Sequence, residues 1–233
     1  MKCKIILFCC IFGLLAAHEI YAQKSSPKTA LPTEEIPLSL DGIIKKIEKR
    51  YESEGFSAKF TQKSVLKAME ITDTASGSLL IRRPGMMRWE YEMPDKQMII
   101  TDSVSLWVFR PNDKQVMVGK APAYFGDGKG ASFLSDIKVL RQNFEVTHEE
   151  KMNEACCYTL KLLPKEKKYN IEVIYLLISK TTSDVVQIVT YNAYGDQTEI
   201  NLSDFKFNLK LDKAVFNFTI PEGVDILKLD EEP

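Results

Sequence analysis

The spacing of apolar and polar residues changes its period near residue 55. Before that point, apolar side chains recur at helical spacing between charged residues, at Leu40, Ile43, Ile44, Ile47 and Tyr51. This pattern predicts an amphipathic helix of three to four turns, and Ser39 is a suitable N-cap because its hydroxyl can accept from a free backbone N–H. After Gly55 the period becomes two, since Phe56, Ala58 and Phe60 alternate with polar residues. A β-strand is therefore predicted to follow the helix.

Short apolar segments separated by turn-forming residues fill most of the remaining chain. Prolines, glycines and asparagine predict turns at 83–85, 93–95, 110–113 and 194–196. Five strands are predicted in the first half of the chain, at 79–81, 87–91, 98–101, 106–109 and 115–118. Six more are predicted in the second half, at 144–146, 157–163, 171–178, 185–191, 197–205 and 215–219. Short turns between consecutive strands indicate antiparallel pairing.

A second helical pattern interrupts the strands. Phe133, Leu134, Ile137 and Leu140 recur as on a helix, after the glycine-rich loop 121–130. So many consecutive strands would curl rather than stay flat, and two helices are too few to cover both faces of the sheet. We therefore expect a mainly β, α+β fold, in which a curled antiparallel sheet forms an incomplete barrel with both helices on its concave side. The enclosed space would hold either side chains or a ligand.

The first 38 residues are predicted to lie outside this fold. Lys2 and Lys4 precede an apolar run without charge, from 5 to 17, and Ala22 offers a small residue for cleavage. These features predict a signal peptide at 1–22 and export of a chain that begins at Gln23. The alternatives are a transmembrane anchor, for which the run is short, and a lipid-modified cysteine, although both cysteines at 9–10 lie inside the run.

The residues after the signal peptide divide into a leader and a domain. Residues 23–38 are rich in proline and have little periodicity, which predicts a flexible leader. Residues 39–233 contain no linker and are predicted to form a single domain.

Charge and cysteine usage narrow the function. Without residues 1–22 the chain has 29 basic and 31 acidic residues, a formal charge of −2, and it lacks the basic stripe that nucleic-acid binding needs. Cys156 and Cys157 are then the only cysteines, and a bond between sequence neighbours would be strained. We expect one buried and one exposed thiol, without a disulfide framework or a Cys-x-x-Cys redox site.

Candidate catalytic groups are few. His148 is the single histidine outside residues 1–22, so a two-histidine metal site is excluded, and its charged surroundings predict a surface residue. The carboxylate pairs at 149–150 and 231–232 lie in charged runs, where exposure is the usual outcome. The glycines at 126, 128 and 130 lack the spacing of a phosphate-binding loop. We therefore expect no enzymatic activity, no cofactor and no metal.

Methionine and aromatic residues are concentrated between residues 86 and 117, a stretch that contains both tryptophans of the chain. Methionine adapts its shape, so such a stretch suits a ligand without fixed shape, such as an acyl chain; the same residues would also fill a core. Alternation places three of these side chains on one face of their strand. The candidate ligand-binding residues are Met87, Trp89, Tyr91, Met98, Trp107, Phe109 and Met117.

Several segments resemble the LolA family of lipoprotein carriers. The resemblance is most specific in Phe56-Ser-Ala-Lys-Phe60-Thr-Gln62, in residues 77–91 with their Arg-Pro-Gly turn, and in Leu106-Trp107-Val-Phe109. Pro94, Asp102 and Gln115 agree as well. The C-terminal half agrees more loosely, at 204–208, 216–218 and 221–226. Together these segments span most of residues 40–227.

The resemblance implies a fold, a function and partners. The fold would be an unclosed β-barrel with helices as a lid over an apolar cavity. The function would be a non-enzymatic periplasmic carrier that shuttles the acyl chains of lipoproteins from the inner to the outer membrane. Its partners would be acylated lipoproteins, an inner-membrane ABC transporter complex and an outer-membrane acceptor. Arg83 corresponds to the family arginine that closes the lid, and Met87 stands where the family often has a phenylalanine at the pocket mouth.

One departure and two rival interpretations accompany the resemblance. Ser103-Val104 follows Asp102 where the family usually turns with glycine, which leaves the shape of that hairpin open. One rival is a LolA-shaped carrier of another amphiphile, such as a glycolipid. The other is a periplasmic module that binds partner proteins through its methionine-rich surface. For a carrier, we expect Arg83 and the loop 121–130 to set the equilibrium between open and closed lids.

Overall fold

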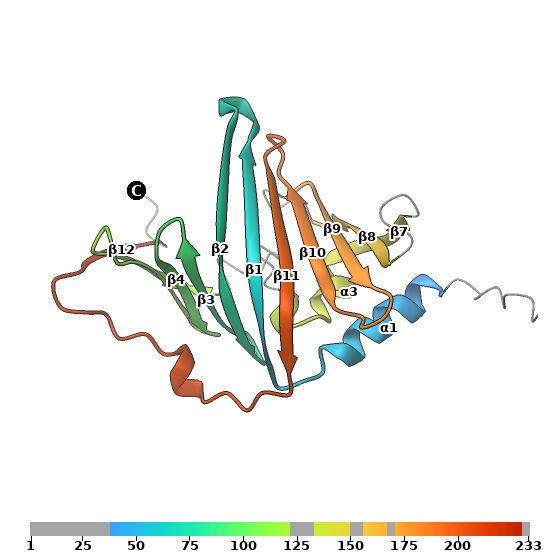
Figure 1. The fold of residues 1–233 in the computed structure, drawn as a ribbon, viewed down its shortest axis with the longest axis horizontal. Helices are drawn as coiled ribbons and strands as arrows, with labels where there is room; N and C mark the ends of the chain where they lie inside the picture. Colours follow the sequence, from blue (N-terminus) through green and yellow to red (C-terminus); the bar gives the residue numbers. More distant parts are fainter. Residues whose placement is uncertain (1–37, 122–132, 150–155, 167–170, 230–233) are drawn as a thin grey trace, which may run out of the picture. The chain divides into compact units, whose positions relative to one another are not determined.

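The computed structural model describes residues 38–121, 133–149, 156–166 and 171–229 (Figure 1). The predicted signal peptide, the cleavage site at Ala22 and almost all of the leader and of the loop 121–130 lie outside the described residues. Those predictions therefore remain predictions. The described residues belong to one unit of the chain, Leu38–Pro233.

In the described part of the chain, twelve strands form one sheet in the order β12-β6-β5-β4-β3-β2-β1-β11-β10-β9-β8-β7. All neighbours pair antiparallel except β12, which runs parallel to β6. Among the described residues the outermost strands, β7 and β12, do not pair with each other, so the sheet is not closed into a barrel, as predicted. The strands are β1 Gly55–Leu66, β2 Ile71–Arg82, β3 Met86–Met93, β4 Gln97–Asp102, β5 Ser105–Arg110, β6 Gln115–Lys120, β7 Phe144–Glu149, β8 Cys157–Pro164, β9 Val173–Ser179, β10 Val185–Tyr191, β11 Gln197–Phe207 and β12 Asp225–Lys228.

The first helix forms as its pattern predicts. Helix α1 (Leu40–Arg50) begins after Ser39, whose Oγ accepts from the backbone N–H of Gly42 at 3.2 Å. Its apolar stripe is buried against the sheet through Ile43, Ile44 and Ile47. In the part of the chain that the structure describes, no helix has the length and apolar character that a membrane span requires.

The second predicted helix is not continuous. Residues 133–135 form a single 3-10 turn, and only Val139–Asn143 is helical, as α3. Backbone bonds here join residues three apart, and Asp136 Oδ1 accepts from the N–H of Lys138 at 3.2 Å. A carboxylate that binds a nearby backbone N–H competes with regular helix, which accounts for the break. The four apolar residues of the pattern are nevertheless all buried.

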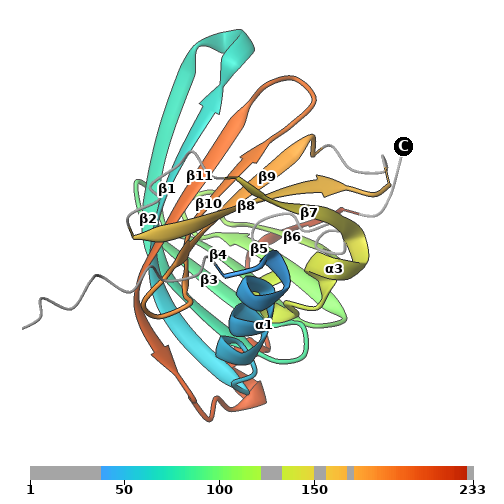
Figure 2. The same cartoon turned by 90° about the vertical axis from the view of Figure 1, so that its right-hand side faces the viewer.

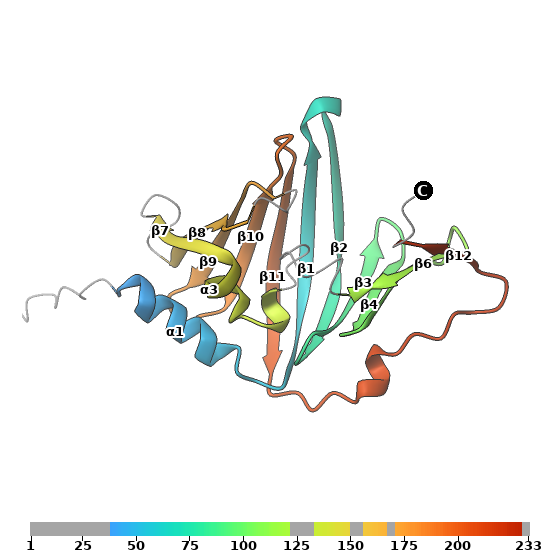
Figure 3. The same ribbon diagram turned by 180° about the vertical axis from the view of Figure 1, so that it is seen from behind.

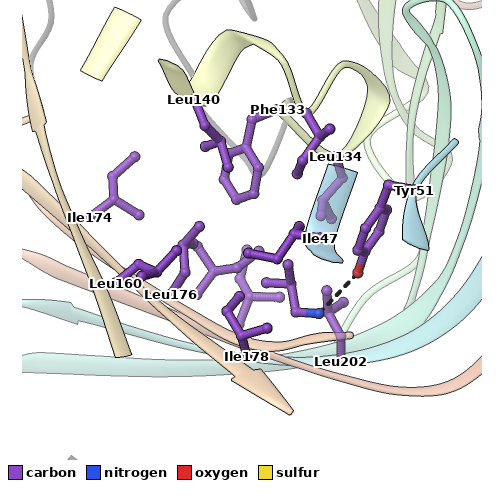
Figure 4. Packing of buried hydrophobic residues seen from close by; sticks show 14 of the residues in the cluster. Ile47, Tyr51, Phe133, Leu134, Leu140, Leu160, Ile174, Leu176, Ile178 and Leu202 are labelled. Carbon is purple, nitrogen blue, oxygen red and sulfur yellow. Dashed lines mark hydrogen bonds between the residues drawn. The ribbon is translucent and has the colours of Figure 1, made fainter. Parts of the chain in front are cut away.

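Both helical segments lie on one face of the sheet (Figures 2 and 3). We call the face that contacts α1 the inner face, the opposite one the outer face, and α1 together with residues 133–143 the roof. Figure 4 shows Phe133, Leu134 and Leu140 of the roof facing Leu160, Ile174 and Leu176 of the strands, with Ile47 between them. The core therefore lies between the roof and the inner face.

The C-terminal part of the prediction is wrong in two places. Residues 215–219 were expected as a strand, but Lys213–Phe216 is a 3-10 helix, η3, in a segment that runs from the end of β11 to β12 (Figure 1). We call residues 208–224 the strap. The alternation that suggested a strand arises because Phe216 and Phe218 pack against the sheet without joining it. Strand β12 was not predicted, because all four of its residues are exposed and its apolar core is only two residues long.

The two adjacent cysteines behave as predicted. Cys156 is exposed and Cys157 is buried, both are thiols, and their Sγ atoms lie 3.1 Å apart. Burial raises the pKa of the Cys157 thiol to about 11, with a further contribution from Cys156. Cys157 therefore stays protonated at neutral pH and is a poor nucleophile.

Candidate functional site

The aromatic and methionine side chains of β3 lie on the inner face. Met87 and Trp89 are 2% and 3% exposed and belong to the apolar cluster under the roof, and Tyr91 packs at its margin. The ring of Phe60, on β1, lies 4.9 Å from the rings of both Trp89 and Tyr91. The prediction that Met87, Trp89 and Tyr91 share one face is confirmed.

The other four predicted residues do not all share that face. In antiparallel strands, directly opposed residues point to the same side of the sheet. Trp89 pairs with Ile99 and Ile99 with Val108, which in turn pairs with Met117, so Met117 lies on the inner face. The remaining residues, Met98, Trp107 and Phe109, lie on the outer face, because Met98 pairs with Glu90 and with Phe109.

The three outer-face residues lie beside or under the strap. The ring of Phe218 lies 5.3 Å from that of Phe109 and 6.4 Å from that of Trp107. Arg88, also on the outer face, donates from Nη1 to the carbonyl of Val215 at 3.1 Å and from Nη2 to Met98 Sδ at 3.5 Å. These side chains attach the strap to the outer face, and the sheet itself separates them from the inner face.

Trp89 holds a buried donor on the inner face. Its Nε1 is buried and has no hydrogen-bond partner among the described residues. A buried N–H without an acceptor costs about 1–3 kcal/mol, so such a group is usually retained for a reason. A ligand carbonyl that entered between the roof and the sheet would supply the missing acceptor.

Arg83 lies in the turn between β2 and β3, near the roof. Its backbone N–H donates to the carbonyl of Glu54 at 2.8 Å, and its Nε and Nη2 are buried without a partner among the described residues. Burial lowers the pKa of its guanidinium, while the nearby charges of Asp136 and Glu52 oppose that shift. Asp136 belongs to the roof, so the charge of Arg83 interacts electrostatically with the element that covers the inner face.

A family model for the outer membrane lipoprotein carrier protein LolA matches residues 51–219. The chain belongs to the LolA family. Among curated relatives, the outer-membrane lipoprotein carrier protein of Legionella pneumophila (strain Lens) is 29% identical over 219 residues, 94% of this chain and 96% of that protein. The protein of the same name from Neisseria meningitidis (strain FAM18) is 29% identical over 176 residues, 76% of this chain and 82% of that protein.

A solved structure shares the fold of this chain. An uncharacterized conserved protein from Thermus thermophilus superposes with a TM-score of 0.52 at 12% identity, covering 81% of this chain and 98% of that one. At such low identity the likeness supports the arrangement of strands and helices alone.

Two sets of contacts hold the roof in place, one buried and one exposed. At the C-terminal end of α1, Tyr51 is fully buried and its hydroxyl accepts from the N–H of Val185 at 3.0 Å (Figure 4). Arg50 stacks on Phe207, 3.8 Å from the ring centroid, and pairs with the buried Asp184 at 2.6 Å. This end is therefore fixed to β10 and β11.

The other connection is exposed. Arg141 of α3 pairs with Asp41 at 2.8 Å and with Glu48 at 2.9 Å, and so joins the two helical parts of the roof at the surface. Neither Arg141 nor the Arg50–Asp184 pair was predicted. The paired residues lie 93 to 134 positions apart in the sequence, and no local pattern signals such contacts.

Proposed function

We propose that the protein is a periplasmic carrier that holds the acyl chains of lipoproteins between its roof and its inner face and shuttles them from the inner to the outer membrane. The observation on which this proposal mainly rests is the continuous apolar layer between the roof and one face of an unclosed sheet. Inside this layer lies the Trp89 N–H, which has no acceptor among the described residues. Membership of the LolA family and the names of the Legionella and Neisseria relatives support it.

For acyl chains to enter this layer, the roof would have to move away from the inner face. Each methylene removed from water contributes about 0.8 kcal/mol, so ten would contribute on the order of 8 kcal/mol before the losses of opening. The buried side chains of the roof and of the inner face pack against each other. The cargo would therefore replace contacts of the roof, and release would be favoured when the roof closes again.

Four inner-face residues of the predicted set remain candidates for cargo contact: Met87, Trp89, Tyr91 and Met117. Arg83 would control closure, because its half-buried guanidinium is attracted to the charge of Asp136 in the roof. Binding and release need no bond to be made or broken, so the protein acts without catalysis and without a cofactor. An inner-membrane ABC transporter complex would load the carrier, and an outer-membrane acceptor would receive the cargo.

A release assay tests this function. The chain from Gln23 onward is added to inner-membrane vesicles that contain a palmitoylated lipoprotein, with its unacylated form as the control. The proposal predicts ATP-dependent release of the acylated form alone. Absence of release, together with a glycolipid found in the purified protein by mass spectrometry, would instead assign the fold to a carrier of another amphiphile.

A further inference from the structure

The inner face does not end with the apolar cluster. Beyond Tyr91, between the long β1–β2 hairpin and the strands β4 and β5, lies a cleft of about 530 Å³. Its lining is mostly polar and includes Gln62, Ser64, Asp73, Gln97, Arg110 and Asn112. Cross-strand pairing places these strand residues on the inner face, since Gln62 pairs with Ala75 and Tyr91 with Gln97.

Tyr91 marks the border between the apolar cluster and this polar cleft. Its ring packs edge-on against Phe60 at 4.9 Å, and its hydroxyl donates to Gln62 Oε1 at 3.0 Å. An amphipathic side chain in this position separates a zone suited to hydrocarbon from a zone suited to groups that keep hydrogen bonds. The two zones therefore form one continuous surface with a defined boundary.

The polar groups of the cleft are partly held in place by one another. Gln62 Nε2 donates to Ser64 Oγ at 3.1 Å, Arg110 Nε to Gln97 Oε1 at 3.2 Å, and Asn112 Nδ2 to Asp95 Oδ1 at 3.0 Å. These contacts orient the amide groups, and no described residue accepts a hydrogen bond from the outer nitrogens of Arg110. Both donors and acceptors are thus available along the cleft.

We propose that this cleft binds the peptide segment of the cargo lipoprotein that directly follows its acylated residue. The inference rests on the proposed function and extends it to the polar part of the same ligand. Acyl chains are joined to one residue of a lipoprotein, so the peptide must leave the apolar layer next to them. Side-chain amides with mixed charges match the N–H and C=O groups of an extended peptide. A sugar headgroup is less well matched, because Tyr91, the one aromatic ring among the described residues that line the cleft, packs against Phe60.

Two synthetic ligands separate this inference from the proposed function. One is dipalmitoylglyceryl-cysteine amide, and the other is the same lipid extended by ten polar residues. The protein is expected to bind the extended ligand about tenfold more tightly, which corresponds to about 1.4 kcal/mol. In the variants Gln97→Ala and Arg110→Ala that advantage should disappear, while the affinity for the short ligand stays unchanged. Lys59→Ala, an exposed position on the outer face of β1, is the matched control and should keep the advantage.

The outcomes are distinct. Equal affinity of the unaltered protein for the two ligands would overturn the inference and leave the carrier function standing. Failure to bind either ligand would overturn both. As a second measurement, a photoreactive side chain placed at Ala75, inside the cleft, should label the peptide of the extended ligand. Labelling of the acyl chains instead would contradict the proposed division of the inner face.

Discussion

Ser103 adopts a backbone conformation that usually belongs to glycine. Its φ is 84°, and two residues connect β4 to β5, so a tight hairpin forms here without a glycine. Asp102 compensates, because its Oδ1 accepts from the N–H groups of Val104 at 2.9 Å and Ser105 at 2.7 Å. Hydrogen bonds to the Asp102 side chain thus stabilise a turn for which glycine would be the usual residue.

Replacing Ser103 with glycine should stabilise the protein. The left-handed conformation costs a non-glycine residue about 1–2 kcal/mol, and part of that gain is lost because glycine makes the unfolded chain more flexible. Ser103→Gly is expected to raise the free energy of unfolding by about 0.5–1 kcal/mol in urea titrations. A decrease would show that the serine side chain contributes more than its backbone costs.

The side chain of Arg83 should favour the closed position of the roof. Arg83→Leu removes a half-buried charge, of which Nε and Nη2 have no partner among the described residues, and with it the attraction to Asp136. We expect the variant to load acylated cargo but to release it less readily, by about tenfold, as 1.4 kcal/mol in the closing equilibrium would produce. The neighbouring Arg82→Leu is the control, since Arg82 pairs with Glu54 instead. Unchanged loading and release in Arg83→Leu would exclude it from the closing mechanism.

At the scale of elements, local signals were sufficient where turns and periodicity agree. The strands from β3 to β6 lie where proline, glycine and alternation placed them, and Ser39 caps α1 as expected. Strand β2 was predicted only at 79–81 and runs from Ile71 to Arg82. Local patterns failed where contacts of single side chains decide the backbone. In the second predicted helix, Asp136 accepts from a nearby backbone N–H. In the strap, Phe216 and Phe218 pack against the sheet without joining it. The predicted set of ligand-binding residues was divided for a related reason. Alternation gives the phase within a strand, but the phase between strands depends on hairpin register, which divided the predicted residues between two faces.

The Arg141 ion pairs should act as a latch between α1 and α3. Exposed ion pairs contribute little to global stability, so Arg141→Ala should leave the unfolding transition almost unchanged. It should instead lower the hydrogen-exchange protection of α1 several-fold, since Asp41 near its beginning and Glu48 near its end lose their tie to α3. Lys45→Ala is the control, because Lys45 also pairs with Asp41 but belongs to α1 itself.

The latch should depend on pH in one direction. Hydrogen bonds from Lys45 and then Arg141 hold the pKa of Asp41 below its usual range. A lowered carboxyl pKa gives a contribution that is present above the unfolded value, about 4, and is lost as the pH falls through the lower folded value. Protection of α1 is therefore expected to be constant from about pH 5 to 8 and to decrease only in stronger acid. Loss of protection near neutral pH would assign the latch to other groups.

Across the whole described unit, the two faces of the sheet differ in the side chains they carry and in what covers them. The inner face bears the apolar cluster, the Trp89 N–H that has no acceptor among the described residues, and the polar cleft beyond Tyr91. The outer face of β3 to β5 bears the strap, which packs on Phe109 and Trp107. The strap thereby covers apolar side chains that an exposed sheet face would leave in water. In the proposed function, cargo would thus bind on one side of these strands and the strap would support them on the other.

The two tryptophans of the chain make this division measurable, because Trp89 lies on the inner face and Trp107 on the outer face. The measurement is fluorescence quenching by a lipopeptide with brominated acyl chains, in Trp107→Phe, which keeps Trp89, and in Trp89→Phe, which keeps Trp107. Contact quenching of Trp89 with little effect on Trp107 is the predicted result. Equal quenching of both, or quenching of Trp107 alone, would contradict an acyl-chain site between the roof and the inner face.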